Sequence, residues 1–264
     1  MDKDKIIFIK KFLYDLQTRF LKDLNLPISL KTFAEPRNKH NFKHICKLID
    51  IIPELGYKGN LLDIGLGSGK QLFSIVQAKN YNFYSIEHPK MNELLKYNYF
   101  RNLIARFNIH LKRVDIVKSN LPYKDNFFDV VVFNNIIEHM QPGDVFSVLR
   151  EIHRILRKDG ILIVETPNIF SLVHRIKAVF GIDFGYDLGE AFINKRGYPS
   201  HIKEYSINEI KILLKNYGFR TDKLIMSQLQ YGKPIIDAIV NIPVFFWPYA
   251  RNTILVTAKK INML

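Results

Sequence analysis

The stretch LLDIGLGSGK, residues 61–70, places three glycines directly behind an apolar run that contains an aspartate. The glycines stand at alternate positions, Gly65, Gly67 and Gly69. An apolar strand that turns through glycines into a helix lets backbone approach a ligand closely. The dinucleotide pattern GxGxxG would need a glycine where this chain has Lys70. Asp63 lies close enough to the turn to repel a pyrophosphate, so the loop favours S-adenosylmethionine, which carries an ammonium and a sulfonium.

Short apolar runs alternate with amphipathic helices from residue 60 onward. Strands are predicted at 60–65, 82–87, 109–115, 128–134 and 161–166, followed by two late strands at 219–226 and 253–258. Helices are predicted at 69–79, 92–107, 144–158 and 206–217. This alternation indicates an α/β fold, with a largely parallel sheet covered by helices on both faces.

Two further acidic residues follow predicted strands. Glu87 ends the second strand, where a carboxylate can accept both ribose hydroxyls of a nucleoside. Asp115 ends the third strand, where a carboxylate could receive an adenine amino group. Acidic residues are also common in such turns, so the assignment of Glu87 has the stronger basis.

The regular alternation is flanked and interrupted by other segments. Residues 1–56 are predicted to form an N-terminal helical extension, and residues 57–264 the main domain. Within the main domain, residues 167–200 contain a glycine-rich stretch typical of a lid, and residues 227–250 form an apolar C-terminal element. We therefore expect one nucleotide-binding domain with a variable substrate side.

The chain of 264 residues has a formal net charge of +14, which favours anionic partners. Its single cysteine, Cys46, excludes an internal disulfide and a cysteine-built zinc site. The N-terminus does not have the pattern of a signal peptide, and we expect a cytoplasmic protein. The stretch at 235–249 is too short to span a bilayer and is most typical of a core or pocket element. Trp247 and Tyr249 would also suit a helix lying in a membrane interface, so peripheral membrane contact stays open.

Four blocks of residues 60–170 together resemble a known family. They are the glycine loop, the strand that ends in Glu87, LPYKDNFFDVVVFNNIIEHM (residues 121–140) and LREIHRILRKDGILIVETPN (residues 149–168). In this order they resemble the class I S-adenosylmethionine-dependent methyltransferases of the type 11/12 group. The resemblance implies a Rossmann-like sheet of seven strands whose last strand is antiparallel. It also implies cofactor contacts from Asp63, Gly65, Gly67, Glu87, Asp115, Ile116, and Asn134 or Asn135.

Methyl transfer is an in-line displacement, so the enzyme has to align the reacting atoms and exclude water. A hydroxyl acceptor also needs a base at neutral pH. Two histidines are candidates: His139 follows the fourth strand, at the edge where ligands bind in open α/β sheets, and His201 closes the predicted lid. His139 could instead be a helix-start residue that holds the loop together, and His201 could instead be a surface histidine.

The sequence NIIEH with a later histidine resembles the metal site of methyltransferases that act on the terminal 2′-hydroxyl of small RNAs. Glu138, His139 and His201 match that pattern, while Asn135 stands where the family has a glutamate. An asparagine can ligate a hard cation but contributes no charge, so metal affinity should drop. Whether a metal is used stays open.

The leading hypothesis is an O-methyltransferase for a small-molecule, glycan or lipid-linked acceptor, with an anionic acceptor favoured by the positive charge. An RNA 2′-O-methyltransferase with a metal-assisted site is the second hypothesis, and a non-catalytic cofactor-binding subunit is the third. The sequence leaves open the acceptor atom and the oligomeric state.

Overall fold

The computed structural model describes residues 38–89, 93–183, 201–228 and 234–261, together with the isolated positions Ile7 and Lys11. Most of the predicted N-terminal extension, and residues 184–200 of the predicted lid, lie outside these ranges. The cofactor loop, the sheet and the residues that we selected as catalytic candidates lie within them.

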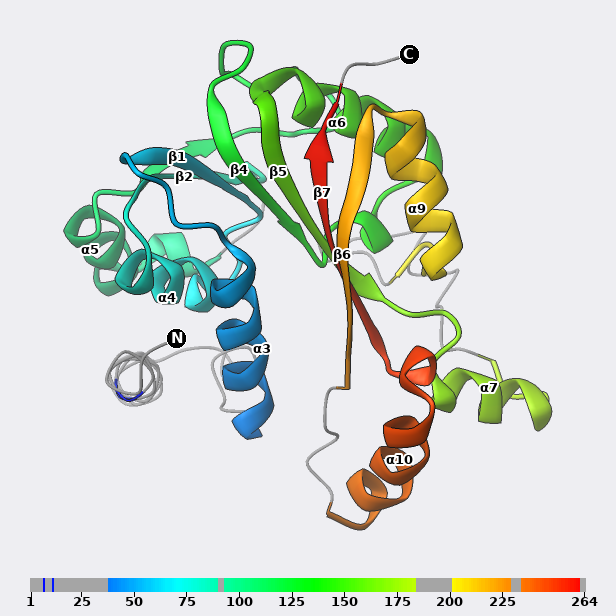
Figure 1. Ribbon diagram of the computed structural model, residues 1–264. Coiled ribbons are helices and arrows are strands. Elements are labelled where there is room, and N and C mark those ends of the chain that lie inside the picture. The colour runs from blue at the N-terminus through cyan, green and yellow to red at the C-terminus, as the bar shows by residue number, and fades with distance from the viewer. Residues whose placement is uncertain are drawn as a thin grey trace.

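A sheet of seven strands forms the centre of the molecule (Figure 1). The strands are β1 (Gly59–Ile64), β2 (Tyr81–Glu87), β3 (His110–Arg113), β4 (Phe128–Asn134), β5 (Leu156–Pro167), β6 (Phe219–Ser227) and β7 (Thr253–Lys260). Their order in the sheet is β3-β2-β1-β4-β5-β7-β6. The first five strands pair in parallel, and β7 runs antiparallel between β5 and β6. This confirms the predicted mostly parallel, Rossmann-like sheet.

Helices cover both faces of this sheet. They are α3 (Asn38–Ile51), α4 (Lys70–Ala78), α5 (Asn98–Arg106), α6 (Pro142–Ile155), α7 (Leu172–Val179), α9 (Ile207–Asn216) and α10 (Pro234–Phe246), with short 3₁₀ turns η1 (Glu93–Lys96), η2 (Ile137–His139) and η3 (Pro248–Ala250). The core cluster on one face unites α3, α4 and α5 with the sheet, and the cluster on the other face unites α6 and α9 with it (Figure 1).

The central strand β4 shows why helices are needed on both faces of the sheet. All seven of its residues are buried. Val130 and Val132 pack with the α3–α4–α5 face, whereas Val131 and Phe133 pack with the α6–α9 face. Successive side chains of a strand point to opposite faces, so a continuous apolar run needs a helix layer on each side.

Two helix boundaries differ from the predicted ones. The predicted helix 92–107 is divided into η1 and α5 because Tyr97 has extended backbone angles, φ −91 and ψ 132. Arg101 donates to the carbonyls of Leu95 and Lys96 and so compensates for the helical bonds lost at the break. The predicted helix 144–158 begins earlier, at Pro142 with Gln141 as its N-cap, and ends at Ile155.

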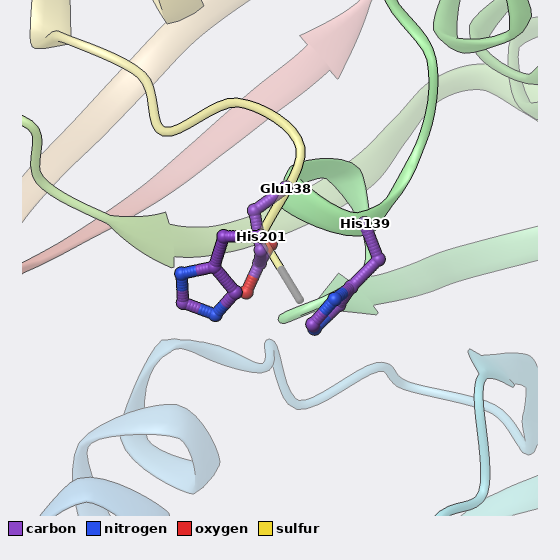
Figure 2. A group of neighbouring side chains, drawn as sticks. All are labelled: Glu138, His139 and His201. Atoms are coloured by element: carbon purple, nitrogen blue, oxygen red, sulfur yellow. The ribbon is translucent and has the colours of Figure 1, made fainter. Parts of the chain in front are cut away.

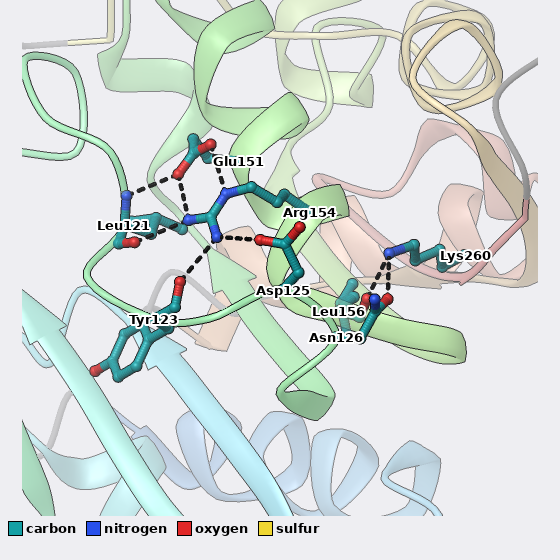
Figure 3. Close-up of polar contacts among 8 residues, drawn as sticks. All are labelled: Leu121, Tyr123, Asp125, Asn126, Glu151, Arg154, Leu156 and Lys260. Carbon is teal, nitrogen blue, oxygen red and sulfur yellow. Dashed lines mark hydrogen bonds and ion pairs between the residues drawn. The ribbon is translucent and has the colours of Figure 1, made fainter.

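Arg154, near the end of α6, holds together the loop that leads into β4 (Figure 3). Its guanidinium donates to both carboxylate oxygens of Glu151, at 2.9 and 2.7 Å, and to Asp125 at 2.8 Å. It also donates to the backbone carbonyls of Tyr123 and Leu121, at 2.8 and 2.9 Å. The hydrogen bonds to Glu151 are the main cause that raises the pKa of Arg154. The loop and the helix therefore fix the start of the strand that delivers the candidate catalytic residues.

The apolar C-terminal element forms α10 and η3. Val240 and Val244 are buried, whereas Ile242 and Phe246 are 64% and 81% exposed, so one side of α10 is packed and the other is accessible. Among the helices in the described ranges, none has the length and apolar character that crossing a bilayer requires.

Candidate functional site

A cavity of about 600 Å³ opens at the carboxyl ends of β1, β2 and β4. It lies where the strand order reverses, between β1 and β4, the position at which open α/β sheets bind their ligands. Eight of the predicted site residues line it: Gly65, Gly67, Glu87, Asp115, Ile116, Asn134, Asn135 and His139. Ser68, Gln71 and His88 also line the cavity and were not singled out from the sequence.

The three loop glycines all have positive φ angles, of 86°, 51° and 70°. Gly67 faces the cavity, and an added Cβ there would meet no atom closer than 4.0 Å. At Gly69, the N-cap residue of α4, an added Cβ would lie 2.4 Å from the ring of Phe73. Gly67 therefore leaves room for a ligand, whereas Gly69 lets the helix begin close behind the loop.

Glu87 is 4% exposed and holds the loop from the end of β2. Its Oε2 accepts a hydrogen bond from the Gly67 N–H at 2.9 Å, and its Oε1 accepts one from the His88 N–H at 2.9 Å. The carboxylate is thus oriented at the cavity wall by backbone donors, and a carboxylate oxygen can accept more than one hydrogen bond.

Asp115 lies on the far side of the cavity from the glycine loop along the sheet, after β3. Its Oδ1 accepts from the Val117 N–H at 3.2 Å, and its Oδ2 lies 3.4 Å from His88 Nε2. Burial raises the pKa of Asp115, but the Val117 hydrogen bond together with the charges of His88 and Lys118 outweighs it, and the net shift is downward. Asp115 therefore stays ionised as an acceptor.

Asp63 lies behind the loop, only 1% exposed. Its Oδ1 accepts from Gln71 Nε2 at 3.2 Å, and Gln71 Oε1 accepts from the Asn134 side chain at 3.3 Å. Burial and the nearby charge of Glu87 raise the pKa of Asp63 to about 8. Among the described residues, Asp63 Oδ2 and Asn134 Oδ1 are buried acceptors without a donor. Two such acceptors beside the cavity fit a ligand with a positively charged, hydrogen-donating end.

Glu138, His139 and His201 form a cluster beside this cavity (Figure 2). Each offers a potential ligand atom, and these atoms lie within 4.8 Å of one another. The rings of His139 and His201 meet edge to face, with centroids 5.0 Å apart. Glu138 and His139 belong to η2 after β4, whereas His201 comes from the segment before α9.

Backbone hydrogen bonds explain how two segments far apart in the sequence meet here. The N–H groups of Ile202 and Lys203 donate to the Glu138 carbonyl, at 2.7 and 3.2 Å. An isolated bridge pairs Asn168 with Tyr205 just beyond. The segment at 201–205 is therefore fixed against η2 and the end of β5. This attachment places the His201 side chain next to Glu138 and His139.

The cluster has unusual protonation properties. Burial raises the pKa of Glu138 to about 7, even though His201 and the Thr166 hydroxyl, which donates to Glu138 at 3.2 Å, favour the ionised form. The hydrogen bond between His201 Nδ1 and Glu204, at 2.9 Å, raises the pKa of His201 and outweighs its burial. Shifted pKa values of this kind are typical of catalytic clusters.

A further set of polar residues surrounds the cluster, and the sequence did not single it out. On one side, His174 of α7 lies 3.3 Å from the second oxygen of Glu204. On the other side, His44 Nε2 of α3 lies 2.7 Å from Glu165 of β5, and the Asn135 amide lies 3.5 Å from the same carboxylate. These contacts join elements that are distant in the chain, so no local motif marks them.

Comparisons with known proteins identify the family. A family model described as a methyltransferase domain matches residues 37–224. An uncharacterized protein of Methanocaldococcus jannaschii is 31% identical over 149 residues, which cover 53% of this chain and 60% of that protein. A probable S-adenosylmethionine-dependent methyltransferase of Mycobacterium tuberculosis is 30% identical over 158 residues, 55% of this chain and 51% of that protein. The chain thus spans about half to three fifths of the length of these curated relatives.

Solved structures show the same fold. The crystal structure of a SAM-dependent methyltransferase from Archaeoglobus fulgidus superposes with a TM-score of 0.54 at 18% identity, over 83% of this chain and 93% of that one. Together with the strand order and the glycine loop, the family match confirms the resemblance drawn from the sequence. The chain belongs to the methyltransferase domain family, whose cofactor is S-adenosylmethionine.

Proposed function

We propose that the protein transfers a methyl group from S-adenosylmethionine to a hydroxyl group of a small-molecule, glycan or lipid-linked acceptor. The observation that carries this proposal is the Glu138–His139–His201 cluster, because it sets a potential base beside the cofactor cavity. A hydroxyl needs such a base, whereas many nitrogen acceptors do not.

Different residues around the cavity would hold different parts of the cofactor. Glu87 would accept the ribose hydroxyls, and Asp115, with Ile116 beside it, would accept the adenine amino group. Asn134 and Asn135 also line the cavity, and Asp63, behind Gln71, would give up its proton and supply negative charge when the ammonium group binds. Gly65 and Gly67 leave the backbone open to the ligand, and Gly69 positions the helix.

When bound, S-adenosylmethionine supplies a methyl group attached to positively charged sulfur. His139 would take the proton of the acceptor hydroxyl as the oxygen forms its bond to the methyl carbon and the carbon–sulfur bond breaks. Glu138 would stabilise the proton that His139 has gained, and Glu204 would orient His201 through their 2.9 Å hydrogen bond. The His139 ring touches the cavity while Glu138 stays buried, which suits this division of roles.

The His139→Ala variant tests the proposal. We expect methyl transfer from labelled cofactor to a panel of phenolic, glycan and polyprenyl hydroxyl acceptors to fall at least a hundredfold. Binding of S-adenosylhomocysteine should change by less than threefold, and turnover should partly recover at high pH, where hydroxyls ionise more readily. His110→Ala, on the edge strand β3, is the matched control. Full activity of His139→Ala at neutral pH would remove this residue from the reaction.

A second candidate function rests on the metal-compatible geometry of the same three residues. A divalent cation held by Glu138, His139 and His201 could activate the 2′-hydroxyl at the end of an RNA, and the net charge of +14 would favour RNA binding. On the leading proposal, treatment with EDTA leaves turnover unchanged. Loss of activity in EDTA with recovery in Mn²⁺, together with RNA binding that weakens steeply with salt, would favour the second candidate instead.

A further inference from the structure

Helices α7 and α10 form a unit of their own at one end of the molecule (Figure 1). Val240, Val244 and Ala250 pack against Leu172 and Val173, which forms a small apolar cluster separate from the two main cores. Pro167, the last residue of β5, pairs with Thr253, the first residue of β7. Because α7 follows β5 and α10 precedes β7, both helices lie beyond the carboxyl ends of the parallel strands. The α7–α10 unit therefore lies at the same edge of the sheet as the candidate active site.

Both helices also present apolar side chains on the faces that do not pack against each other. In α7 and directly after it, Ile176, Val179 and Phe180 are 45%, 81% and 73% exposed. In α10, Ile239, Ile242 and Phe246 are 63%, 64% and 81% exposed. We call these six residues the α7–α10 surface. A helix that is apolar on both faces is normally enclosed, and an apolar patch of this kind marks an interaction site.

Aromatic and basic side chains border the α7–α10 surface. Trp247 is 47% exposed, and the Arg175 guanidinium lies 4.4 Å from its ring centroid. A cavity of about 330 Å³ beside it is lined by Arg175, Lys211 and Tyr249, among others. Apolar side chains next to tryptophan, tyrosine and basic groups are the combination that sits at the boundary between lipid headgroups and acyl chains.

We propose that the α7–α10 surface docks on an anionic lipid bilayer, with a lipid phosphate at Arg175 and Lys211. The net charge of +14 attracts the chain to an anionic membrane, whereas it opposes pairing of two copies of the chain. The helices protrude from the sheet, so a flat surface can reach them (Figure 1).

Docking there has a consequence for the substrate. His174 of α7 lies 3.3 Å from Glu204, which holds His201, so the membrane-facing unit touches the candidate active site. The link to the active site rests on the proposed function. If the protein docks on a membrane there, the lipid-linked acceptors are the class of hydroxyl acceptor that the site would meet. The docking itself does not depend on methyl transfer and can be measured without it.

Trp247 is the single tryptophan of the chain and reports docking directly. Vesicles of phosphatidylcholine with phosphatidylglycerol should shift its emission to shorter wavelength and protect it from acrylamide, and the protein should float with the vesicles. Vesicles of phosphatidylcholine alone should bind at least tenfold more weakly. An unchanged emission spectrum, with the protein left behind on flotation, would overturn the proposal.

Two pairs of variants locate the contact. Val179→Asp combined with Phe246→Asp should weaken binding at least tenfold, whereas Ile212→Asp on α9, where the side chain is 60% exposed, should not. Lys211→Glu should reduce the preference for anionic vesicles, and Lys215→Glu on the same helix should leave it unchanged. Equal binding by all four proteins would overturn the assignment. A blue shift that depends on protein concentration without vesicles, with doubled mass in light scattering, would assign the surface to a second copy instead.

Discussion

At the scale of single residues, the site depends on carboxylates in very different surroundings. Glu87 and Asp115 stand at the cavity wall with backbone donors, while Asp63 and Glu138 are buried and have raised pKa values. Glu87 and Asp115 are suited to accept hydrogen bonds from a ligand. Asp63 and Glu138 are suited to lose a proton when a positive charge comes near.

Replacement of Glu87 by alanine should weaken the binding of S-adenosylhomocysteine at least tenfold, because two hydroxyl contacts and the hydrogen bond to the Gly67 N–H are lost. Calorimetric titration measures this directly, with NAD as a negative control ligand. Glu54→Ala, at a position remote from the cavity, should bind normally. Unchanged affinity of Glu87→Ala would show that the ribose lies elsewhere.

Asp63 should make the stability of the ligand-free protein depend on pH. Its folded-state pKa of about 8 lies above the ordinary value of 3.8, so the folded protein binds the proton more tightly than the unfolded chain. Its stabilising contribution is therefore present below about pH 4 and is lost progressively as pH rises to about 8. Asp63→Asn should be the more stable protein at pH 8, and the difference should vanish at acidic pH.

Urea unfolding over this pH range measures the effect. Asp63→Asn should bind S-adenosylmethionine more weakly although it is more stable, because it lacks the negative charge. A constant difference in stability at every pH would mean that Asp63 is already ionised in the folded protein.

At the scale of elements, the loop that precedes β4 shows how a helix fixes a strand. Arg154 joins α6 to Leu121, Tyr123 and Asp125, and Lys260 of β7 donates to the Leu156 carbonyl and to Asn126 nearby (Figure 3). These polar contacts fix the first residues of β4. The 3₁₀ turn η2, which carries Glu138 and His139, comes directly after the last residues of the same strand.

Arg154→Lys should lower the free energy of unfolding by about 2 kcal/mol, because an ammonium cannot replace the planar set of donors and leaves backbone carbonyls without partners. Chemical denaturation measures the loss. Arg150→Lys, an exposed position on the same helix, should change stability little. A loss that is equal in the two variants would assign the effect to helix propensity instead of the loop contacts.

At the scale of the whole molecule, α3 connects the N-terminal region to the candidate active site. His44 reaches Glu165 on β5, and Glu165 is 2% exposed next to Asn135 and close enough to Glu138 to raise its pKa. An element that precedes the glycine loop in the sequence thus faces the residues after β4.

His44→Ala should lower the free energy of unfolding by about 2 kcal/mol, because it removes the 2.7 Å contact to the buried Glu165 carboxylate and leaves only the longer one from Asn135. Thermal unfolding checks this, with Lys58→Ala, at an exposed position after α3, as the control. The variant should also shift the pH profile of turnover, since Glu165 acts on Glu138. Wild-type stability would show that α3 holds its place without the contact between His44 and Glu165.

The sequence by itself determined the sheet and the cofactor side of the site, because these depend on local patterns. Continuous apolar runs such as residues 128–133 predict strands buried on both faces, and the glycines at 65, 67 and 69 predict the turn that lines the cavity. Glu87 ends β2 as predicted, whereas β3 ends at Arg113 and Asp115 lies two residues beyond it.

Only the tertiary structure decided the acceptor side. His201 reaches Glu138 through backbone bonds between distant segments, and Glu204, His174, His44 and Glu165 surround the cluster from four separate elements. The apolar stretch after residue 234 is typical of a core or pocket element and is also compatible with a membrane-interface helix, and its exposure depends on how α7 and α10 pack. Contacts between distant elements have no period or spacing in the sequence, because they depend on how the chain folds back on itself.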